Sequence, residues 1–266
     1  MPAKVRRISL VGAFESLPEA VPQAARLTEA RAHCPSCRWR ALCLPLGLDF
    51  AELGRFDNLI GRERRLRKDQ PLFVAGNPFR ALYALRSGAV RTTIVAEDGR
   101  EQVAGYHILG EVIGMDGIAT AHHVCGAVAV MDTEFCAIPF DRLEALAQAI
   151  PGLQRNLYRL LSRELGHHHE RMLMLGSMDA RERLASFLLD LSERYRRRGQ
   201  SACALTLHLS REELGSYLGL KLETVSRAFS RLQAAGALQV QGRDIKLLDL
   251  PALRRLLGRE DRVPDA

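Results

Sequence analysis

The sequence predicts a mixed α+β protein: a β-domain of short strands comes first, then one long helix, then a helical domain that ends in a two-stranded hairpin. Three observations support this order. Short apolar runs separated by glycine lie between Arg65 and Pro139, a helical stripe of apolar residues follows Pro151, and two short helical segments flank Gly219. With 266 residues, the chain is long enough for two domains with separate cores.

The composition is that of a folded globular protein, with 47% apolar and 26% charged residues. The longest uncharged stretch, residues 117–131, is shorter than the roughly 20 apolar residues of a membrane-spanning helix. Glu15 and Glu19 interrupt the start of the chain too early for a signal peptide. We therefore expect a cytoplasmic protein with no membrane partner. In that reducing compartment, the six cysteines favour metal or redox chemistry over disulfides.

Residues 1–46 are expected to form an N-terminal arm and a cysteine-containing loop, and residues 47–150 a β-domain. The turn dipeptide Asp98-Gly99 is typical of a hairpin, so the runs on either side of it should pair. Short strands with glycine-containing turns indicate an antiparallel roll or barrel. The predicted strands cover residues 71–76, 81–88, 91–95, 101–106 and 126–131.

Residues 151–179 are predicted to form one long helix with an apolar stripe. The stripe advances by three or four residues at a time, which is coiled-coil spacing. We expect it to be the interface of a homodimer, although such a stripe can also pack on the β-domain of its own chain. Its members are Leu157, Leu161, Leu165, His168, Met172 and Leu175.

Residues 180–266 are expected to form a winged helix-turn-helix domain. Ser210 and Glu213 match the capping box that starts a helix. Gly219 allows the sharp turn that ends this helix, and a second helix should follow over residues 222–234. Two further runs, residues 237–240 and 245–248, predict the hairpin of the wing.

The second helix has one face suited to reading DNA bases. Its apolar face should be buried and consists of Leu222, Val225, Phe229 and Leu232. Glu223, Ser226 and Arg227 lie together on another face. Arg can bond to guanine through two hydrogen bonds, Glu accepts from the amino group of cytosine, and Ser can donate or accept. The alternative is that these residues are simply solvated. A polyanion partner is favoured because residues 181–266 hold 16 basic and 11 acidic residues within a chain of net charge +7.

The segment from Leu209 to Leu232, LSREELGSYLGLKLETVSRAFSRL, resembles the helix-turn-helix signature of the CRP/FNR superfamily. The resemblance extends over nearly the whole chain beyond the first thirty residues. It implies an N-terminal cyclic-nucleotide-binding-like β-roll, a long dimerisation helix and a C-terminal winged helix. It also implies a transcription regulator, not an enzyme, that binds double-stranded DNA as a homodimer and acts with RNA polymerase.

Cys34, Cys37 and Cys43 follow the pattern C-x2-C-x5-C, which brings three thiolates together and leaves a fourth ligand position open. An iron–sulfur cluster and a structural zinc ion both accept such ligands. A c-type haem is excluded because Arg38, and not histidine, follows the second cysteine. An iron–sulfur enzyme would also need acid and base residues in a substrate cleft, and the sequence contains no such motif.

The cysteine spacing resembles the fumarate and nitrate reduction regulator (FNR) branch of the superfamily. In that branch a fourth cysteine in the β-roll completes a 4Fe–4S cluster, and Cys136 in the segment FCAIP is the matching residue. The resemblance implies an oxygen-responsive regulator that binds a palindromic site close to TTGAT-N4-ATCAA under anaerobic conditions. Cys125 is the competing fourth ligand. Cys203 is expected to be a small buried residue, and neither of these two is assigned a role.

The stretch Gly110-Glu-Val-Ile-Gly114 resembles part of the nucleotide-binding cassette of the superfamily. The phosphate-binding Arg-Ser pair of that cassette is replaced here by Val124-Cys125. No guanidinium is then present to neutralise a buried phosphate. Cyclic AMP is therefore not expected as the ligand, and a CRP-like regulator with zinc or another effector stays as the alternative.

Overall fold

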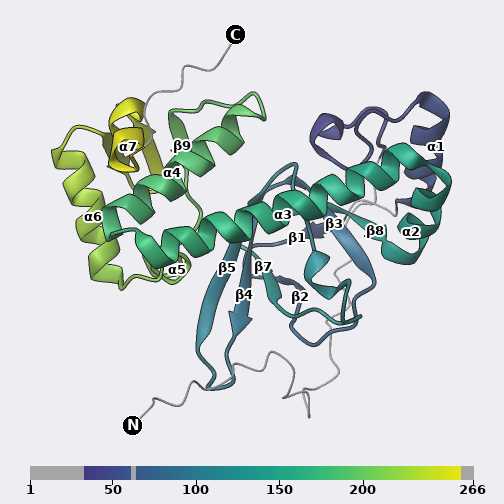
Figure 1. Ribbon diagram of the computed structural model, residues 1–266, viewed down its shortest axis with the longest axis horizontal. Helices are drawn as coiled ribbons and strands as arrows, with labels where there is room; N and C mark the ends of the chain where they lie inside the picture. Colours follow the sequence, from purple (N-terminus) through teal and green to yellow (C-terminus); the bar gives the residue numbers. More distant parts are fainter. Residues whose placement is uncertain (1–32, 61–63, 259–266) are drawn as a thin grey trace.

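The computed structural model describes residues 33–60 and 64–258 and has the predicted α+β architecture (Figure 1). Of the predicted N-terminal arm and cysteine-containing loop, residues 1–46, the first 32 residues lie outside the described residues. A β-roll, one long helix and a C-terminal helical domain follow one another along the chain. The long helix crosses the molecule, with the cysteine-containing segment near its start and the C-terminal domain at its end (Figure 1).

The β-roll consists of two antiparallel four-stranded sheets with strand orders β1-β8-β3-β6 and β2-β7-β4-β5. Apolar side chains from both sheets share one core cluster, which includes Phe73, Leu85, Val90 and Phe135. The strands are β1 (Arg64–Leu66), β2 (Pro71–Phe73), β3 (Ala81–Ser87), β4 (Ala89–Val95), β5 (Glu101–Ile108), β6 (Val112–Ile113), β7 (Gly126–Ala129) and β8 (Thr133–Pro139).

The predicted hairpin is confirmed. Val95 of β4 lies opposite Glu101 of β5, and Gly99 in the turn between them has a φ of 81°, a conformation that favours glycine. The five predicted strands correspond to β2, β3, β4, β5 and β7, whereas β1, β6 and β8 are additional. β1 begins with two exposed arginines and β6 is two residues long, so neither has the alternating apolar pattern of a typical strand.

Four helices lie between the cysteine-containing segment and the C-terminal strands, either beside the β-roll or following it in the chain: α1 (Phe50–Leu59), α2 (Phe140–Ala149), α3 (Pro151–Ser177) and α4 (Ala180–Arg196). The long helix α3 ends where Met178 becomes extended, and Asp179 then starts α4 through a capping box with Glu182. No helix in the described ranges combines the length and the apolar character needed to cross a membrane.

The C-terminal domain confirms the winged helix-turn-helix. The side chain of Ser210 accepts from the amide of Glu213 at 3.0 Å, and Glu213 accepts in return from the amide of Ser210 at 2.7 Å. Gly219 ends the helix with a φ of 63°. The wing strands are joined by a third strand that the sequence pattern does not predict. The elements are β9 (Ala204–Thr206), α5 (Arg211–Leu218), α6 (Leu222–Ala234), β10 (Leu238–Gln241), β11 (Asp244–Leu247) and α7 (Leu250–Leu256).

A buried charge cluster joins the C-terminal domain to the β-roll. Glu111 accepts from Arg194 Nε at 2.9 Å and from Arg198 Nη2 at 2.8 Å, and the three side chains are 21%, 13% and 5% exposed. Burial alone would raise the pKa of Glu111, but the two guanidinium groups outweigh this effect and hold the pKa below its usual range. The carboxylate is therefore ionised at neutral pH and fixes the end of α4 to the β-roll.

Glu111→Gln is expected to lower the free energy of unfolding by about 3 kcal/mol at pH 7, because it removes the counter-ion of the buried Arg198 guanidinium and leaves Arg194 paired with Asp190 alone. Urea unfolding measures this difference. Since the folded pKa is lowered, the stabilisation is present above the unfolded pKa of about 4.3 and is lost as the pH falls through the folded pKa. Glu193→Gln, which breaks an ion pair with exposed arginines, is the control and should cost at most about 1 kcal/mol. Equal costs for the two variants would contradict the prediction.

Candidate functional site

Hydrogen bonds attach the first part of the cysteine loop (residues 34–46) to its surroundings. The amide of Cys34 donates to Asp57 Oδ1 of α1 at 2.6 Å, and this bond is buried. The indole Nε1 of Trp39 donates to the carbonyl oxygen of Arg86 on β3 at 2.9 Å. The loop is therefore attached both to α1 and to the sheet that carries β8.

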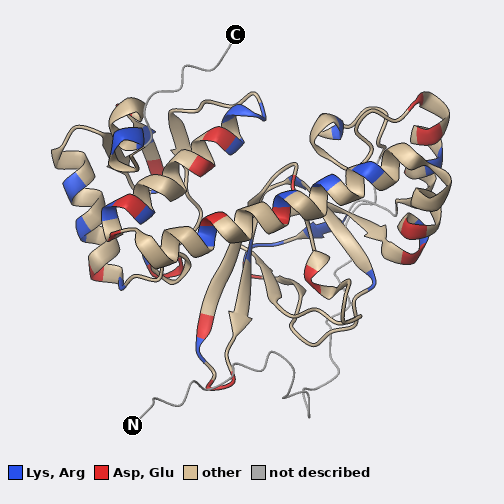
Figure 2. Cartoon of the chain, viewed as in Figure 1, with Lys and Arg blue, Asp and Glu red and all other residues tan. Residues whose placement is uncertain are grey.

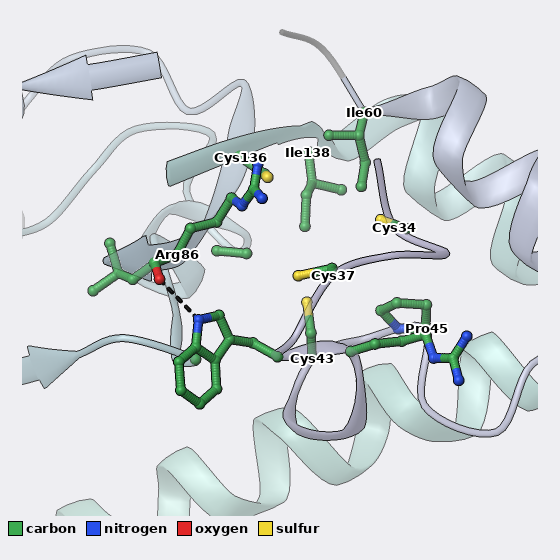
Figure 3. A pocket seen from close by; sticks show the side chains of 13 residues that line it. Cys34, Cys37, Cys43, Pro45, Ile60, Arg86, Cys136 and Ile138 are labelled. Carbon is green, nitrogen blue, oxygen red and sulfur yellow. Dashed lines mark hydrogen bonds between the residues drawn. The ribbon is translucent and has the colours of Figure 1, made fainter. Parts of the chain in front are cut away.

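Four of the six cysteines line one pocket. Cys34, Cys37 and Cys43 come from the cysteine loop, and Cys136 comes from β8 (Figure 3). Cys34 and Cys136 are 8% and 7% exposed. The rest of the lining is largely apolar and includes Ile60, Ala84, Leu85 and Ile138. The structure thus brings together the four cysteines that the sequence and the family resemblance single out.

The environment of this pocket keeps its buried thiols protonated. Burial raises the pKa of Cys34, and it raises that of Cys43 to about 12. The neighbouring cysteines, Cys37 and Cys136, add to the rise in both. Metal ligation requires thiolates and would release these protons. Within the described ranges, no three His, Cys, Asp or Glu side chains already stand in an arrangement that could hold a single metal ion.

The other two cysteines lie elsewhere. Cys125 is buried in the core cluster between the two sheets, where its thiol is 3.4 Å from Asp116 Oδ2, and it does not line the pocket. Cys203 is exposed, so the expectation that it is buried is wrong. It lies in the connection between α4 and β9, where its side chain reaches solvent.

At both ends of the predicted stripe on α3, the side chains pack against other parts of the same chain. Leu157 is 8% exposed and belongs to the same core cluster as Cys34 and Cys136. Leu175, near the other end, packs against the core of the C-terminal domain. These two residues therefore connect α3 to the two domains at its ends.

The middle of the stripe faces solvent. Leu165 and Met172 are 57% and 70% exposed, His168 is also exposed, and Leu161 is half-buried. Tyr158, which is 58% exposed, lies seven residues before Leu165 and continues the same line. The spacing of the stripe does not single out Tyr158, because the adjacent Leu157 continues the apolar pattern equally well. The exposed seam is thus Tyr158, Leu165, His168 and Met172, and the half-buried Leu161 beside it packs against the core cluster that contains Cys34.

The candidate base-reading residues lie together on the surface of α6. Glu223, Ser226 and Arg227 are exposed, and basic positions, all of them arginines, occur along α6 and α7 (Figure 2). Of the four apolar residues expected to be buried, Leu222 is 47% exposed, which corrects that prediction. It is the first residue of α6 and lies beyond the edge of the core formed by Val225, Phe229 and Leu232.

Helix α5, which precedes α6, also contacts the β-roll. Arg91 Nε lies 2.9 Å from Glu213 Oε1. Ser216 provides two further contacts: its carbonyl oxygen accepts from Gln102 Nε2 at 2.8 Å, and its hydroxyl accepts from the amide of Val103 at 2.9 Å. The β4–β5 hairpin thus holds the helix that precedes the base-reading helix.

Comparisons with known proteins match both halves of the chain. A cyclic nucleotide-binding domain matches residues 63–149, and a Crp-like helix-turn-helix domain matches residues 182–256. The transcriptional activator protein Anr of Pseudomonas aeruginosa is 42% identical over 228 residues, which are 86% of this chain and 93% of that protein. The fumarate and nitrate reduction regulatory protein of Escherichia coli is 38% identical over 231 residues, 87% of this chain and 92% of that protein.

A solved structure has a similar fold over most of this chain. FixK2 from Bradyrhizobium japonicum is 33% identical and superposes with a TM-score of 0.67, covering 77% of this chain and 98% of that one. The two domain matches coincide with the β-roll and the winged helix-turn-helix, and the relatives are transcription regulators rather than enzymes. The chain belongs to the CRP/FNR family of transcription regulators, in its FNR branch.

Proposed function

We propose that this regulator responds to oxygen through a 4Fe–4S cluster and binds palindromic DNA as a homodimer under anaerobic conditions. The observation that carries the proposal is the convergence of Cys34, Cys37, Cys43 and Cys136 on one apolar pocket. The regulator would act in the cytoplasm together with RNA polymerase. The names of its relatives, among them an anaerobic regulatory protein of Haemophilus influenzae, support a role in the anaerobic response.

The donor set fits such a cluster. Cysteine thiolates are its usual ligands, and four of them are available here around one pocket. When bound, the cluster supplies iron–thiolate bonds that hold the cysteine loop and that oxygen can destroy. A structural zinc ion accepts the same four ligands and is the alternative. Analysis of iron, zinc and acid-labile sulfide separates the two.

One buried side chain connects the cysteine loop with α3. Asn156 is 6% exposed, and its Nδ2 donates to the carbonyl oxygens of Leu44 at 2.9 Å and Leu46 at 2.6 Å. Its Oδ1 accepts from Arg159 one turn later on the same helix, at 3.1 Å. Through Asn156, a change in the position of the cysteine loop would act directly on α3, the helix whose exposed seam would form the dimer.

DNA recognition is assigned to α6. Glu223, Ser226 and Arg227 would read base edges in the major groove, and a two-fold dimer would place two such helices on the two halves of a symmetric site. The resemblance to the FNR branch suggests that this site is close to TTGAT-N4-ATCAA.

The ligand set is tested by replacing each cysteine with Ala and reconstituting the full-length protein without oxygen. We expect each of Cys34→Ala, Cys37→Ala, Cys43→Ala and Cys136→Ala to lose the full complement of iron and sulfide. Cys125→Ala and Cys203→Ala are the matched controls and should load normally. Loss in Cys125→Ala with full loading in Cys136→Ala would show a different fourth ligand. Zinc without sulfide in the wild type would overturn the sensor proposal.

The coupling is tested by Asn156→Leu, which keeps the branching of the side chain, although it is larger, and removes both donated bonds to the loop. Two neutral hydrogen bonds contribute roughly 1–3 kcal/mol together. We therefore expect the ratio of dimerisation constants between cluster-loaded and cluster-free protein to fall by about 5- to 150-fold. Sedimentation measures the ratio, and the iron content should stay unchanged. The exposed neighbour variant Arg155→Ala should keep the wild-type ratio. A wild-type ratio in Asn156→Leu would exclude this route.

Arg227→Ala is expected to weaken binding to the symmetric site by about 1–3 kcal/mol and to relax the preference at one base pair in each half-site. Titrations against a panel of single-base variants of the site, at fixed salt concentration, measure both effects. Arg231→Ala, one turn further along α6, should leave the base preference unchanged. If Arg227→Ala weakened binding equally on every sequence, Arg227 would be a phosphate contact.

A further inference from the structure

The guanidinium group of Arg171, near the end of α3, bridges the β-roll and the C-terminal domain. Its Nη2 donates to the carbonyl oxygen of Val103 on β5 and to that of Tyr217 on α5, the latter at 3.3 Å. The guanidinium carbon also lies 4.2 Å from the centre of the Tyr217 ring, which is a cation–π contact. One side chain of the long helix therefore contacts both the roll and the helix that precedes α6.

The strand that accepts from Arg171 lies at the edge of its sheet. An edge strand such as β5 presents polar backbone groups that no further strand pairs. The amide of Val103 donates to the hydroxyl of Ser216 at 2.9 Å, and the carbonyl oxygen of Val103 accepts from Arg171. Both polar backbone groups of this edge residue are thus bonded to α5 or α3, which fixes the place of α5 against the roll.

Arg171 also completes the C-terminal cap of α5. The last four carbonyl groups of a helix have no partner within the helix. In α5, those of residues 215 and 216 accept from amides in the turn that follows. The carbonyl oxygen of Tyr217 accepts from Arg171, and that of Leu218 accepts from Arg183 Nη1 at 3.0 Å. Cations are favourable at this end of a helix because the macrodipole is negative there.

The second capping residue, Arg183 of α4, binds the end of α3 as well. Its Nη2 donates to the carbonyl oxygen of Leu175 and its Nε to that of Met178, both at 2.9 Å. Arg171 and Arg183 together attach the end of α5 to the end of α3. Because α6 begins directly after the turn that follows α5, these bonds also set the direction of α6 relative to α3. Of the two arginines, Arg171 is the one that is also bonded to β5.

We propose that Arg171 is a positioning residue for DNA recognition, which fixes α6 relative to α3 and so makes the dimer selective for the spacing between the two half-sites. One base pair more or less between the half-sites moves one of them by about 3.4 Å along the DNA and rotates it by roughly 35°. Two α6 helices that are fixed to one pair of α3 helices match a single spacing, whereas loosely held helices adapt to several. The inference rests on the proposed binding of a symmetric site by a homodimer.

The test compares sites of the form TTGAT-N4-ATCAA with sites whose spacer is one base pair shorter or longer. Full-length, cluster-loaded protein is titrated against each at a fixed salt concentration. The wild type should prefer one spacer. Arg171→Met keeps an unbranched side chain and removes the donors, so this preference should fall by about tenfold, because a hydrogen bond to a charged group contributes about that factor. The preference for the bases within each half-site should stay unchanged. Arg163→Met, at an exposed position about two turns earlier on α3, is the matched control and should keep the wild-type spacer preference.

Two results with Arg171→Met would contradict the proposal. One is a folded variant with the wild-type spacer preference, and the other is an equal loss of affinity on all three spacers, which is expected of a residue needed only for folding. If Arg171→Met does not fold, Arg171→Lys decides. Lysine keeps the charge but lacks the planar face that stacks on the Tyr217 ring, so its spacer preference should also fall, and an unchanged preference would overturn the proposal. A wild type that binds no symmetric site would instead overturn the proposed function, and this inference with it.

Discussion

The first turns of α3 are the point on which both the cysteine pocket and the exposed seam depend. Asn156 bonds to the backbone of the cysteine loop, and the next residue, Leu157, packs in the same core cluster as Cys34 and Cys136. A closely packed core accommodates little change in volume without moving its neighbours. A change in the loop therefore reaches α3 through direct contacts, and no long chain of intermediates is needed.

The segment that resembles a nucleotide cassette has its polar groups satisfied within the chain. Glu111 is bound by two arginines at the end of α4, and Asp116 is bound by the amides of Val124 and Cys125. One carboxylate fixes the C-terminal domain, and the other fixes the loop between β6 and β7. The β-roll consequently serves as a scaffold between the cysteine loop and α5, which agrees with the proposed sensor at the edge of the roll, where the cysteine loop meets β8.

Much of the fold could be predicted because its signals are local. The capping box at Ser210 and the turn at Gly219 depend on residues within one helix and the turn that ends it, so the sequence encodes them directly. The pocket is different, because β8 must lie beside the loop before Cys136 can join the other cysteines. The family resemblance supplied this residue. Periodicity alone also cannot show which of Leu157 and Tyr158 is exposed. Leu157 is buried by distant segments of the chain, whereas Tyr158 is exposed.

The seven-residue spacing of Tyr158, Leu165 and Met172 has a geometrical consequence for any paired α3 helices. A straight α-helix falls about 20° short of two full turns over seven residues, so the line joining these side chains drifts around the helix. Two helices that keep all three residues in contact must wind around each other with a left-handed twist. Because α4 follows α3 directly, this twist also rotates the two C-terminal domains about the common axis. In the proposed DNA-bound dimer, the length of α3 beyond Met172 would therefore help to set the angle at which the two α6 helices meet DNA.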